Sequence, residues 1–241
     1  MNDVAKEAMP VASMEKMRPI VHQTLSARVY QDLRELIISG QLQPGERLTL
    51  AGMAAALGTS AMPVREAINK LAADDALEIL PNKSVRVPVL TRSRFQELVV
   101  IRLIVEGLAV EKAAECITEE QLARLAGLEQ AFRREIALSK PNVNQIIQIN
   151  KQFHFTVYAA AKMPVLLSLI EGLWLRIGPV LNLDLRNTSS RRRSDLPSVK
   201  AHRALLDALR AGDGVAAKAA LAMDINGAAE VILSNNGLKE A

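Results

Sequence analysis

The sequence lacks the features that tie a chain to a membrane or to disulfide bonding. Its 241 residues contain no uninterrupted apolar run of about 18 residues, and the N-terminal stretch MNDVAKEAMPVASMEKMRPIV has no hydrophobic signal-peptide core. We therefore expect a soluble, cytoplasmic protein without a membrane partner. The single cysteine, Cys116, cannot form an internal disulfide, and its place in a helical pattern beside Ala114 and Ile117 indicates a small core residue rather than a nucleophile.

The first part of the chain also lacks an excess of positive charge. The whole chain has a formal net charge of +4, but residues 1–90 contain ten Lys or Arg and ten Asp or Glu. The surplus lies in residues 91–241, partly in the arginine run 191–193, which we interpret as a solvated loop. Charge alone is therefore no argument for nucleic-acid binding.

What the sequence does contain is apolar residues, 49% of the chain, enough for one large or two small globular domains. Residues 1–24 show no sustained periodicity, and we predict a flexible tail there. Residues 25–90 are predicted to form three short helices, the first ending at Gly40 and the second at Gly58. The segments LEIL and VRVPV, separated by PNKS, then predict a two-stranded hairpin. This order is typical of a winged helix-turn-helix domain.

The predicted third helix begins in the stretch TSAMPVREAINKL, residues 59–71. Its apolar residues recur at helical spacing and form a stripe that can pack on the other two helices. They are Val64, Ala67, Ile68 and Leu71. We predict that the hydroxyl of Thr59 or Ser60 caps the start of this helix. The opposite face, which includes Arg65, is polar and is therefore free to enter a DNA major groove.

From Thr91 onward helical periodicity replaces the β pattern. Breaks near residues 117, 140, 162, 186–198 and 212 divide this part into six predicted helices. We therefore predict a mostly α protein, with a winged helix-turn-helix at residues 25–90 and an all-α helical bundle at residues 91–236.

Motifs in both parts resemble the GntR transcription regulators. LQPGERL and AAALGTSAMPVREAINKLAADDALEILPNKSVRV are similar to the DNA-binding domain of that family. IRLIVEGLAVEKAA, NKQFHFTVYAAAKMPVLLSLIEGLW and AHRALLDALRAGD resemble the ligand-sensing domain of its FadR branch. The resemblance covers nearly everything after residue 25. It implies a regulator, expected to be a repressor, in which a small organic acid controls DNA binding, while residues 91–236 bind the effector and form a homodimer.

The DNA-binding motif departs from the family pattern at two positions. Ala61 stands where the family usually has an arginine, and Ser84 replaces a glycine of the wing, which we expect to stiffen the wing or alter its approach to the minor groove. A homodimer with two reading heads predicts a double-stranded operator with a short inverted repeat. The residues expected to contact DNA are Ser60, Arg65, Asn82 and Lys83. Of these, Lys83 is expected to act mainly through phosphate.

Four polar residues fall on or beside apolar faces of the predicted bundle. Asn150 and His154 lie four residues apart on one helix, His202 lies on the next-to-last helix and Asp224 on the last. Burying such groups unpaired is costly, so they should bind one another or a cation. An amide oxygen, two imidazoles and a carboxylate can coordinate zinc, nickel or manganese. For each histidine alone, a hydrogen-bonded core residue is the alternative.

The resemblance supports the metal interpretation and qualifies it. Similar regulators place an Asp, a His four residues later and two further His around a metal. Here Asn150 occupies the Asp position and Asp224 the final His position, while His154 and His202 match. The exchange keeps one carboxylate but moves it, which is expected to change metal affinity or preference.

Two arginines are candidates for binding the effector. Arg102 and Glu106 lie together on the inward stripe of the first bundle helix, where an i, i+4 ion pair is one interpretation. The alternative is a guanidinium directed into a cavity to bind a small carboxylate. Arg176 is a weaker second candidate.

A helical metalloenzyme that uses His154, His202 and Asp224 to activate water is the alternative function. It would leave the winged helix-turn-helix without a role, and the sequence contains no separate nucleophile and base. The regulator is therefore the preferred hypothesis.

Overall fold

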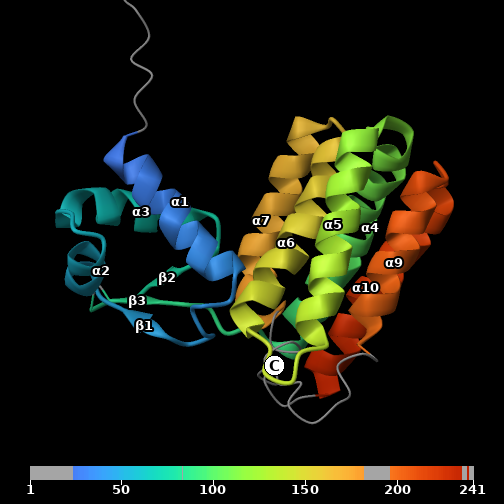
Figure 1. The fold of residues 1–241 in the computed structure, drawn as a ribbon. Coiled ribbons are helices and arrows are strands. Elements are labelled where there is room, and N and C mark those ends of the chain that lie inside the picture. The colour runs from blue at the N-terminus through green and yellow to red at the C-terminus, as the bar shows by residue number, and fades with distance from the viewer. Residues whose placement is uncertain (1–23, 83, 182–195, 235–237, 239–241) are drawn as a thin grey trace, which may run out of the picture.

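The computed structural model describes residues 24–82, 84–181, 196–234 and 238, and shows a small N-terminal region beside a larger helical bundle (Figure 1). The predicted tail, Lys83 and the arginine run 191–193 lie outside the described residues. The N-terminal elements are α1 (Leu25–Ile38), β1 (Arg47–Leu48), α2 (Leu50–Ala56), α3 (Ala61–Ala73), β2 (Glu78–Ile79) and β3 (Val85–Arg86). The bundle consists of α4 (Arg92–Cys116), α5 (Glu119–Ile136), α6 (Val143–Ala160), α7 (Pro164–Leu181), α9 (Pro197–Arg210) and α10 (Gly214–Ser234).

The N-terminal region has the predicted winged helix-turn-helix arrangement. The apolar stripe of α3 is buried as predicted, and Gly40 and Gly58 follow α1 and α2 with positive φ angles of 61°. The predicted two-stranded hairpin was incomplete, because β1 also pairs with β3 in an antiparallel sheet of order β1-β3-β2. β1 is only two residues long, too short for an alternating pattern to reveal it.

The predicted side-chain cap of α3 is wrong. Ser60 occupies the N-cap position with extended backbone angles, but its hydroxyl accepts no hydrogen bond from the helix. The hydroxyl of Thr59 is buried and has no partner in the part of the chain that the structure describes. Ser60 is exposed, so water can satisfy the first N–H groups of α3 instead.

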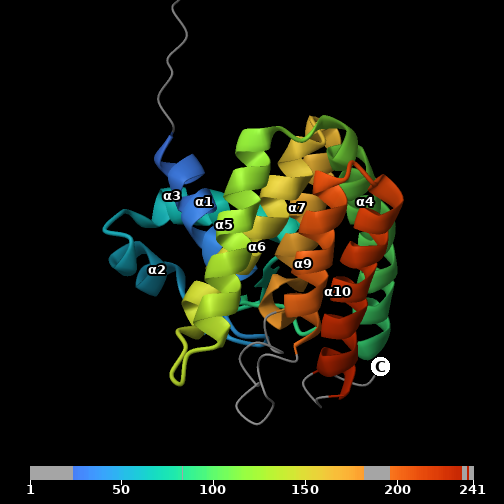
Figure 2. The same cartoon turned by 45° about the vertical axis from the view of Figure 1, so that its right-hand side comes forward.

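The six helices of the bundle agree with the predicted breaks, of which the one at 186–198 lies mostly outside the described residues. α10 lies between α9 and α4, while α5 packs against both α6 and α9 (Figure 2). Cys116, expected in the core, is half-buried at the end of α4. Among the described residues, α7 alone is long and apolar enough to cross a membrane, and 56% of it is buried, as expected for a core helix.

The two parts of the molecule meet where α1 packs against α7. A Cβ atom at Gly178 would lie 2.8 Å from the carbonyl oxygen of Ile37 and 2.8 Å from Cα of Ile38, so only glycine permits this approach. An ion pair between Arg34 Nη2 and Glu171 Oε2, at 3.1 Å, flanks this contact. The winged helix-turn-helix therefore packs directly on a core helix of the bundle.

Candidate functional site

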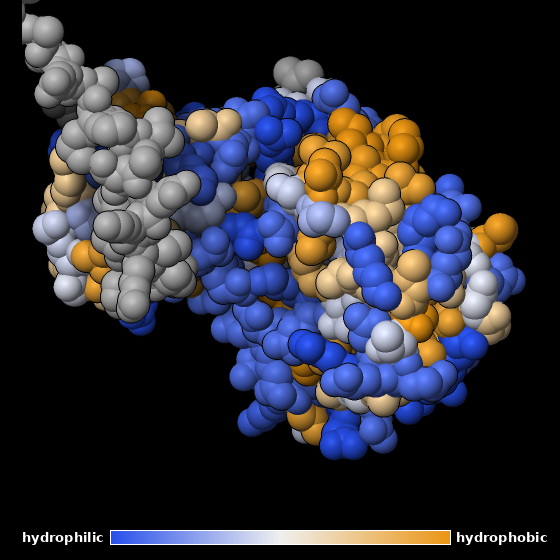
Figure 3. Space-filling view, turned by 90° about the horizontal axis from the view of Figure 1, so that it is seen from above, coloured by the Kyte–Doolittle hydropathy of each residue, from blue (hydrophilic) through white to orange (hydrophobic). Residues whose placement is uncertain are grey.

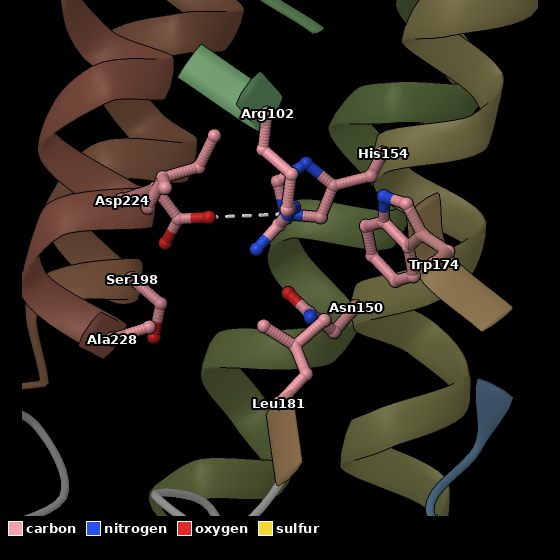
Figure 4. A pocket seen from close by; sticks show the side chains of 9 residues that line it. Arg102, Asn150, His154, Trp174, Leu181, Ser198, Asp224 and Ala228 are labelled. Atoms are coloured by element: carbon pink, nitrogen blue, oxygen red, sulfur yellow. Dashed lines mark ion pairs between the residues drawn. The ribbon is translucent and has the colours of Figure 1, made fainter. Parts of the chain in front are cut away.

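Three of the four predicted metal ligands converge in the interior of the bundle. Figure 4 shows two of them, His154 and Asp224, facing each other. Helices α6, α9 and α10 contribute His154, His202 and Asp224, respectively. Nε2 of His154 lies 3.1 Å from Oδ2 of Asp224 and 3.3 Å from Nε2 of His202, and the His202 nitrogen lies 3.9 Å from the same carboxylate oxygen. Both imidazoles are buried. The packing of these three helices therefore brings three candidate ligand atoms within 4.8 Å of one another.

Asn150 joins this group by lining the same small cavity, one helical turn before His154. The cavity has a volume of about 30 Å³, which suits a metal ion with a water molecule but not a larger ligand without a local rearrangement. Its walls are Arg102, Asn150, His154, Trp174, Leu181, Ser198, Asp224, Ile225 and Ala228. Sequence reasoning missed Trp174, Leu181 and Ser198, because apolar spacing does not distinguish a core wall from a cavity wall.

A buried network of hydrogen bonds lies beside the cavity and is centred on Glu106. Its carboxylate binds Arg102 through Nε–Oε1 at 2.6 Å and Nη2–Oε2 at 3.2 Å. It also accepts hydrogen bonds from the Tyr158 hydroxyl and, at 3.2 Å, from Nε1 of Trp174. Nδ1 of His154 lies 3.3 Å from the same Tyr158 hydroxyl. Sequence reasoning missed Tyr158, because a core tyrosine follows the same spacing as any apolar residue.

Burial and neighbouring charges set the protonation states in this region. Burial lowers the pKa of His202 to about 3, despite the opposing attraction of Asp224. Burial alone would raise the pKa of Asp224, but its hydrogen bond with His154 and the nearby imidazoles lower it. Burial would likewise lower the pKa of Arg102, yet the charge and hydrogen bonds of Glu106 raise it. A neutral imidazole and an ionised carboxylate therefore face each other at neutral pH, as metal binding requires.

The donor atoms fit a divalent transition metal. Two imidazole nitrogens point toward one another beside a carboxylate oxygen, and two lone pairs in that position repel unless a proton or a cation lies between them. Imidazole and carboxylate ligands suit zinc, nickel and manganese. Residues His154, His202 and Asp224 would hold the ion, which would supply a fixed positive charge to the cavity.

The two candidate effector residues occupy different places. Arg102 lines the cavity and also forms the i, i+4 ion pair with Glu106, so both interpretations from the sequence describe part of its role. Its Nη1 atom forms no hydrogen bond within the described ranges. Arg176 does not line this cavity. It contacts the N-terminal region instead, through the carbonyl of Asp74 at 3.2 Å and the carboxylate of Asp75 at 3.5 Å.

Three of the four predicted DNA-binding residues, Ser60, Arg65 and Asn82, are exposed in the N-terminal region, and the fourth lies outside the described residues. Arg65 is exposed on α3 and, with Asn69 and Ile79, lines a groove of about 300 Å³ that runs from α3 to the sheet. In the wing, Asn82 Oδ1 accepts hydrogen bonds from the backbone N–H of Ser84 at 3.1 Å and from its hydroxyl at 2.7 Å. Ser84, which departs from the family pattern, therefore ties the wing turn together.

Comparison with known proteins gives matches in both regions. The model of the bacterial regulatory proteins, gntR family, matches residues 25–87, and that of the FCD domain matches residues 97–227. The HTH-type transcriptional regulator McbR of Escherichia coli (strain K12) is 36% identical over 161 residues, 67% of this chain and 72% of McbR. A probable D-xylose utilization operon transcriptional repressor of Paenarthrobacter nicotinovorans is 30% identical over 82% of this chain and 84% of its own length.

Solved structures agree with these matches. The structure of E. coli McbR/YncC superimposes with a TM-score of 0.80 at 30% identity and covers 88% of this chain and 98% of McbR. A putative GntR regulator from Rhodococcus sp. RHA1 gives a TM-score of 0.68 at 25% identity, covering 87% of this chain and 97% of that one. These relatives are transcription regulators, and they lend no support to the metalloenzyme alternative. The chain belongs to the GntR family of DNA-binding transcription regulators, and its FCD domain places it in the FadR-type branch.

Proposed function

We propose that this regulator is a metal-dependent repressor whose DNA binding is controlled by a small organic acid bound in the bundle cavity. The observation that carries the proposal is the cluster of His154, His202 and Asp224, because His154 and Asp224 line the cavity that Arg102 also lines. A divalent ion and the guanidinium would supply three positive charges, of which the carboxylates of Asp224 and Glu106 balance two. Burying charges of one sign is costly unless an anion neutralises them, so the loaded cavity favours a carboxylate.

Arg102 is suited to contact the effector because its fixed fork leaves one nitrogen unused. Nε and Nη2 bind Glu106, and that ion pair holds the guanidinium plane in place. Nη1 remains available on the side of the cavity (Figure 4). The cavity of about 30 Å³ must widen to admit an organic acid. Two of its walls, Trp174 and Leu181, belong to α7, the helix that contacts α1 at Gly178. Effector binding would thereby reach the DNA-binding region.

DNA contact is assigned to Ser60, Arg65 and Asn82, which are exposed on the winged helix-turn-helix, and to Lys83 from the sequence alone. Arg65 lies in the groove between α3 and the sheet and is the candidate for a bidentate contact with a guanine. One such domain reads too few base pairs to select a site in a genome, so the operator is proposed to be a short inverted repeat bound by a homodimer in the cytoplasm. The name of the Paenarthrobacter relative supports repression as the mode of regulation.

An apolar face of α4 and α7 supports the homodimer. The space-filling view shows a hydrophobic area on the bundle (Figure 3). The most exposed aliphatic side chains of these two helices are Val100, Ile104, Val165 and Leu169, each between 57% and 77% exposed. Patches of this kind mark interaction sites in soluble proteins. A second copy of the chain is the occupant we propose, because two reading heads are needed and a two-fold axis pairs a face with itself.

The experiment that tests this function combines DNA, metal and acid. Untagged protein is mixed with the DNA upstream of its own gene, with zinc or a chelator, and with a panel of small carboxylates. We expect retarded DNA that at least one carboxylate releases only when zinc is present, and thermal shifts identify that acid. DNA retardation that is unchanged by the chelator and by every carboxylate would contradict the proposal. Metal-dependent turnover without DNA binding would favour the enzyme instead.

A further inference from the structure

The two histidines of the cluster differ in what holds their rings in place. Nδ1 of His202 is buried and has no hydrogen-bond partner among the described residues, and its ring is held by Phe132 and Phe153, with centroids 4.6 Å and 4.3 Å away. Nδ1 of His154 instead lies 3.3 Å from the hydroxyl of Tyr158. Of the two histidines, only His154 therefore has a polar partner at Nδ1 among the described residues.

The direction of the Tyr158 hydrogen bonds follows from a count of protons. The hydroxyl has one proton and two neighbours, Glu106 Oε2 and His154 Nδ1. An ionised carboxylate only accepts hydrogen bonds, and it is a stronger acceptor than a neutral imidazole. The Tyr158 proton therefore points to Glu106. The Tyr158 oxygen is left as an acceptor, so its contact with His154 is a hydrogen bond only when Nδ1 carries the proton. In the metal-free protein this arrangement competes with the hydrogen bond between Nε2 of His154 and Asp224.

The Glu106 carboxylate accepts hydrogen bonds from four surrounding donor atoms. Its side chain is completely buried, and each oxygen receives two donors. Oε1 accepts from Nε of Arg102 and Nε1 of Trp174, while Oε2 accepts from Nη2 of Arg102 and from Tyr158. Guanidinium and indole nitrogens can only donate, so this carboxylate cannot reverse the chain of hydrogen bonds.

We propose that Tyr158 and Glu106 are positioning residues for the metal, acting through His154. They keep the proton of His154 on Nδ1, so that Nε2 presents its lone pair to a divalent ion shared with His202 and Asp224. Metal-binding histidines commonly donate their second nitrogen to a carboxylate, and here a tyrosine hydroxyl is inserted between the two. This inference rests on the metal site proposed above.

The first test compares two tyrosine variants that lose the same chemical group. Tyr158→Phe removes the hydroxyl beside His154, and Tyr30→Phe removes a hydroxyl that donates to Asp74 Oδ2 at 3.1 Å, far from the cavity. Zinc affinity is measured on untagged protein by competition with a chelator. We expect Tyr158→Phe to weaken zinc binding by about 10- to 100-fold, the usual effect of losing such a partner, and Tyr30→Phe to leave it unchanged. Thermal unfolding of the zinc-free proteins monitors the folding of both variants.

The second test asks whether Tyr158 acts through His154. In a His202→Ala background, Tyr158→Phe should weaken zinc binding again, because His154 still needs orientation. In a His154→Ala background it should have no further effect, because no ring is left to orient. An Asn150→Asp substitution, present in every protein of this series, adds a charged ligand that keeps the weaker affinities measurable. Equal losses in the two backgrounds would show a merely structural role and overturn the inference.

Nitrogen NMR of the zinc-loaded protein gives a direct signature. In the wild type, Nδ1 of His154 should carry a hydrogen-bonded, slowly exchanging proton, and Tyr158→Phe should shift or remove that signal. An unchanged signal together with unchanged zinc affinity would overturn the role of Tyr158 while leaving the metal site intact. Wild-type protein that binds no zinc would instead overturn the proposed metal site itself, so the two failures are distinguishable.

Discussion

The polar residues around the cavity are buried or partly buried, whereas those of the DNA-binding face are exposed to solvent. Beside the cavity, His154, His202 and Glu106 are buried. The two imidazoles lie 3.3 Å apart, and Tyr158 links Glu106 to His154. On α3, Arg65 and Asn69 are directed to a groove open to solvent. A buried polar network costs stability whenever one member is lost, whereas an exposed polar face does not. Function and folding are therefore coupled in the bundle and separable in the winged helix-turn-helix.

The sharpest contrast is expected between two glutamates. Glu106→Ala should lower the free energy of unfolding by about 3 to 5 kcal/mol, because it leaves the buried charge of Arg102 unpaired. Glu66→Ala, on the exposed face of α3, should change it by no more than about 0.5 kcal/mol. Urea denaturation of both variants measures the difference. Similar losses for the two would remove the distinction between the regions.

Metal should stabilise the bundle as a whole. Zinc at about 100 times its dissociation constant is expected to add about 2.7 kcal/mol to the free energy of unfolding, and chelation should remove that gain. His154→Ala and His202→Ala should each abolish most of the effect, Asp224→Asn should reduce it, and Asn150→Asp should increase it. Metal analysis of tag-free protein with thermal melts tests this. If zinc, nickel and manganese all fail to bind, the cluster is a hydrogen-bonded network without an ion.

A substitution on the DNA-binding face should lower the affinity for DNA without changing the free energy of unfolding. Arg65→Ala is expected to weaken operator binding by about 1 to 3 kcal/mol, because a groove-facing donor is lost while the buried stripe of α3 is untouched. The unfolding free energy should stay within about 0.5 kcal/mol of the wild type. Fluorescence anisotropy and urea melts measure the two quantities. Normal folding with undiminished affinity would contradict the placement of α3 in the groove.

Acid should destabilise the metal-free bundle gradually. The pKa of His202 is about 3 in the folded protein and about 6.5 when unfolded, so the unfolded chain takes up this proton first as the pH falls. The free energy of unfolding should therefore decrease below about pH 6.5, by at most about 1.4 kcal/mol per pH unit for this group. The lowered pKa of Asp224 acts in the same direction at lower pH.

His202→Phe supplies the control for this pH dependence, since a ring of similar shape can stack between Phe132 and Phe153 but cannot take up a proton. Denaturation curves between pH 7 and pH 4 should be flatter for the variant. Equal slopes for variant and wild type would assign the pH dependence to other groups.

Periodicity in the sequence predicted the helices and pointed to the candidate metal ligands for the same reason. His154, His202 and Asp224 interrupt apolar stripes, and an interruption is visible wherever the stripe is regular. Tyr158 and Trp174 do not interrupt a stripe, so their hydrogen bonds to Glu106 could not be predicted. Residue spacing within one helix also gave no means of placing Arg176, whose partners Asp74 and Asp75 belong to the other region of the chain.

The close approach at Gly178 has a mechanical consequence. Where side chains meet, a small displacement can be taken up by a change of rotamer, but here the backbone of α7 rests on the backbone of α1 at Ile37 and Ile38. No flexible side chain lies between the two backbones at this point. A displacement of α7 toward α1 therefore cannot be absorbed by side-chain rearrangement at this contact. Trp174, one turn earlier on α7, lines the cavity. If the cavity binds an effector, a shift of α7 at Trp174 is therefore expected to reach α1 through the contact at Gly178.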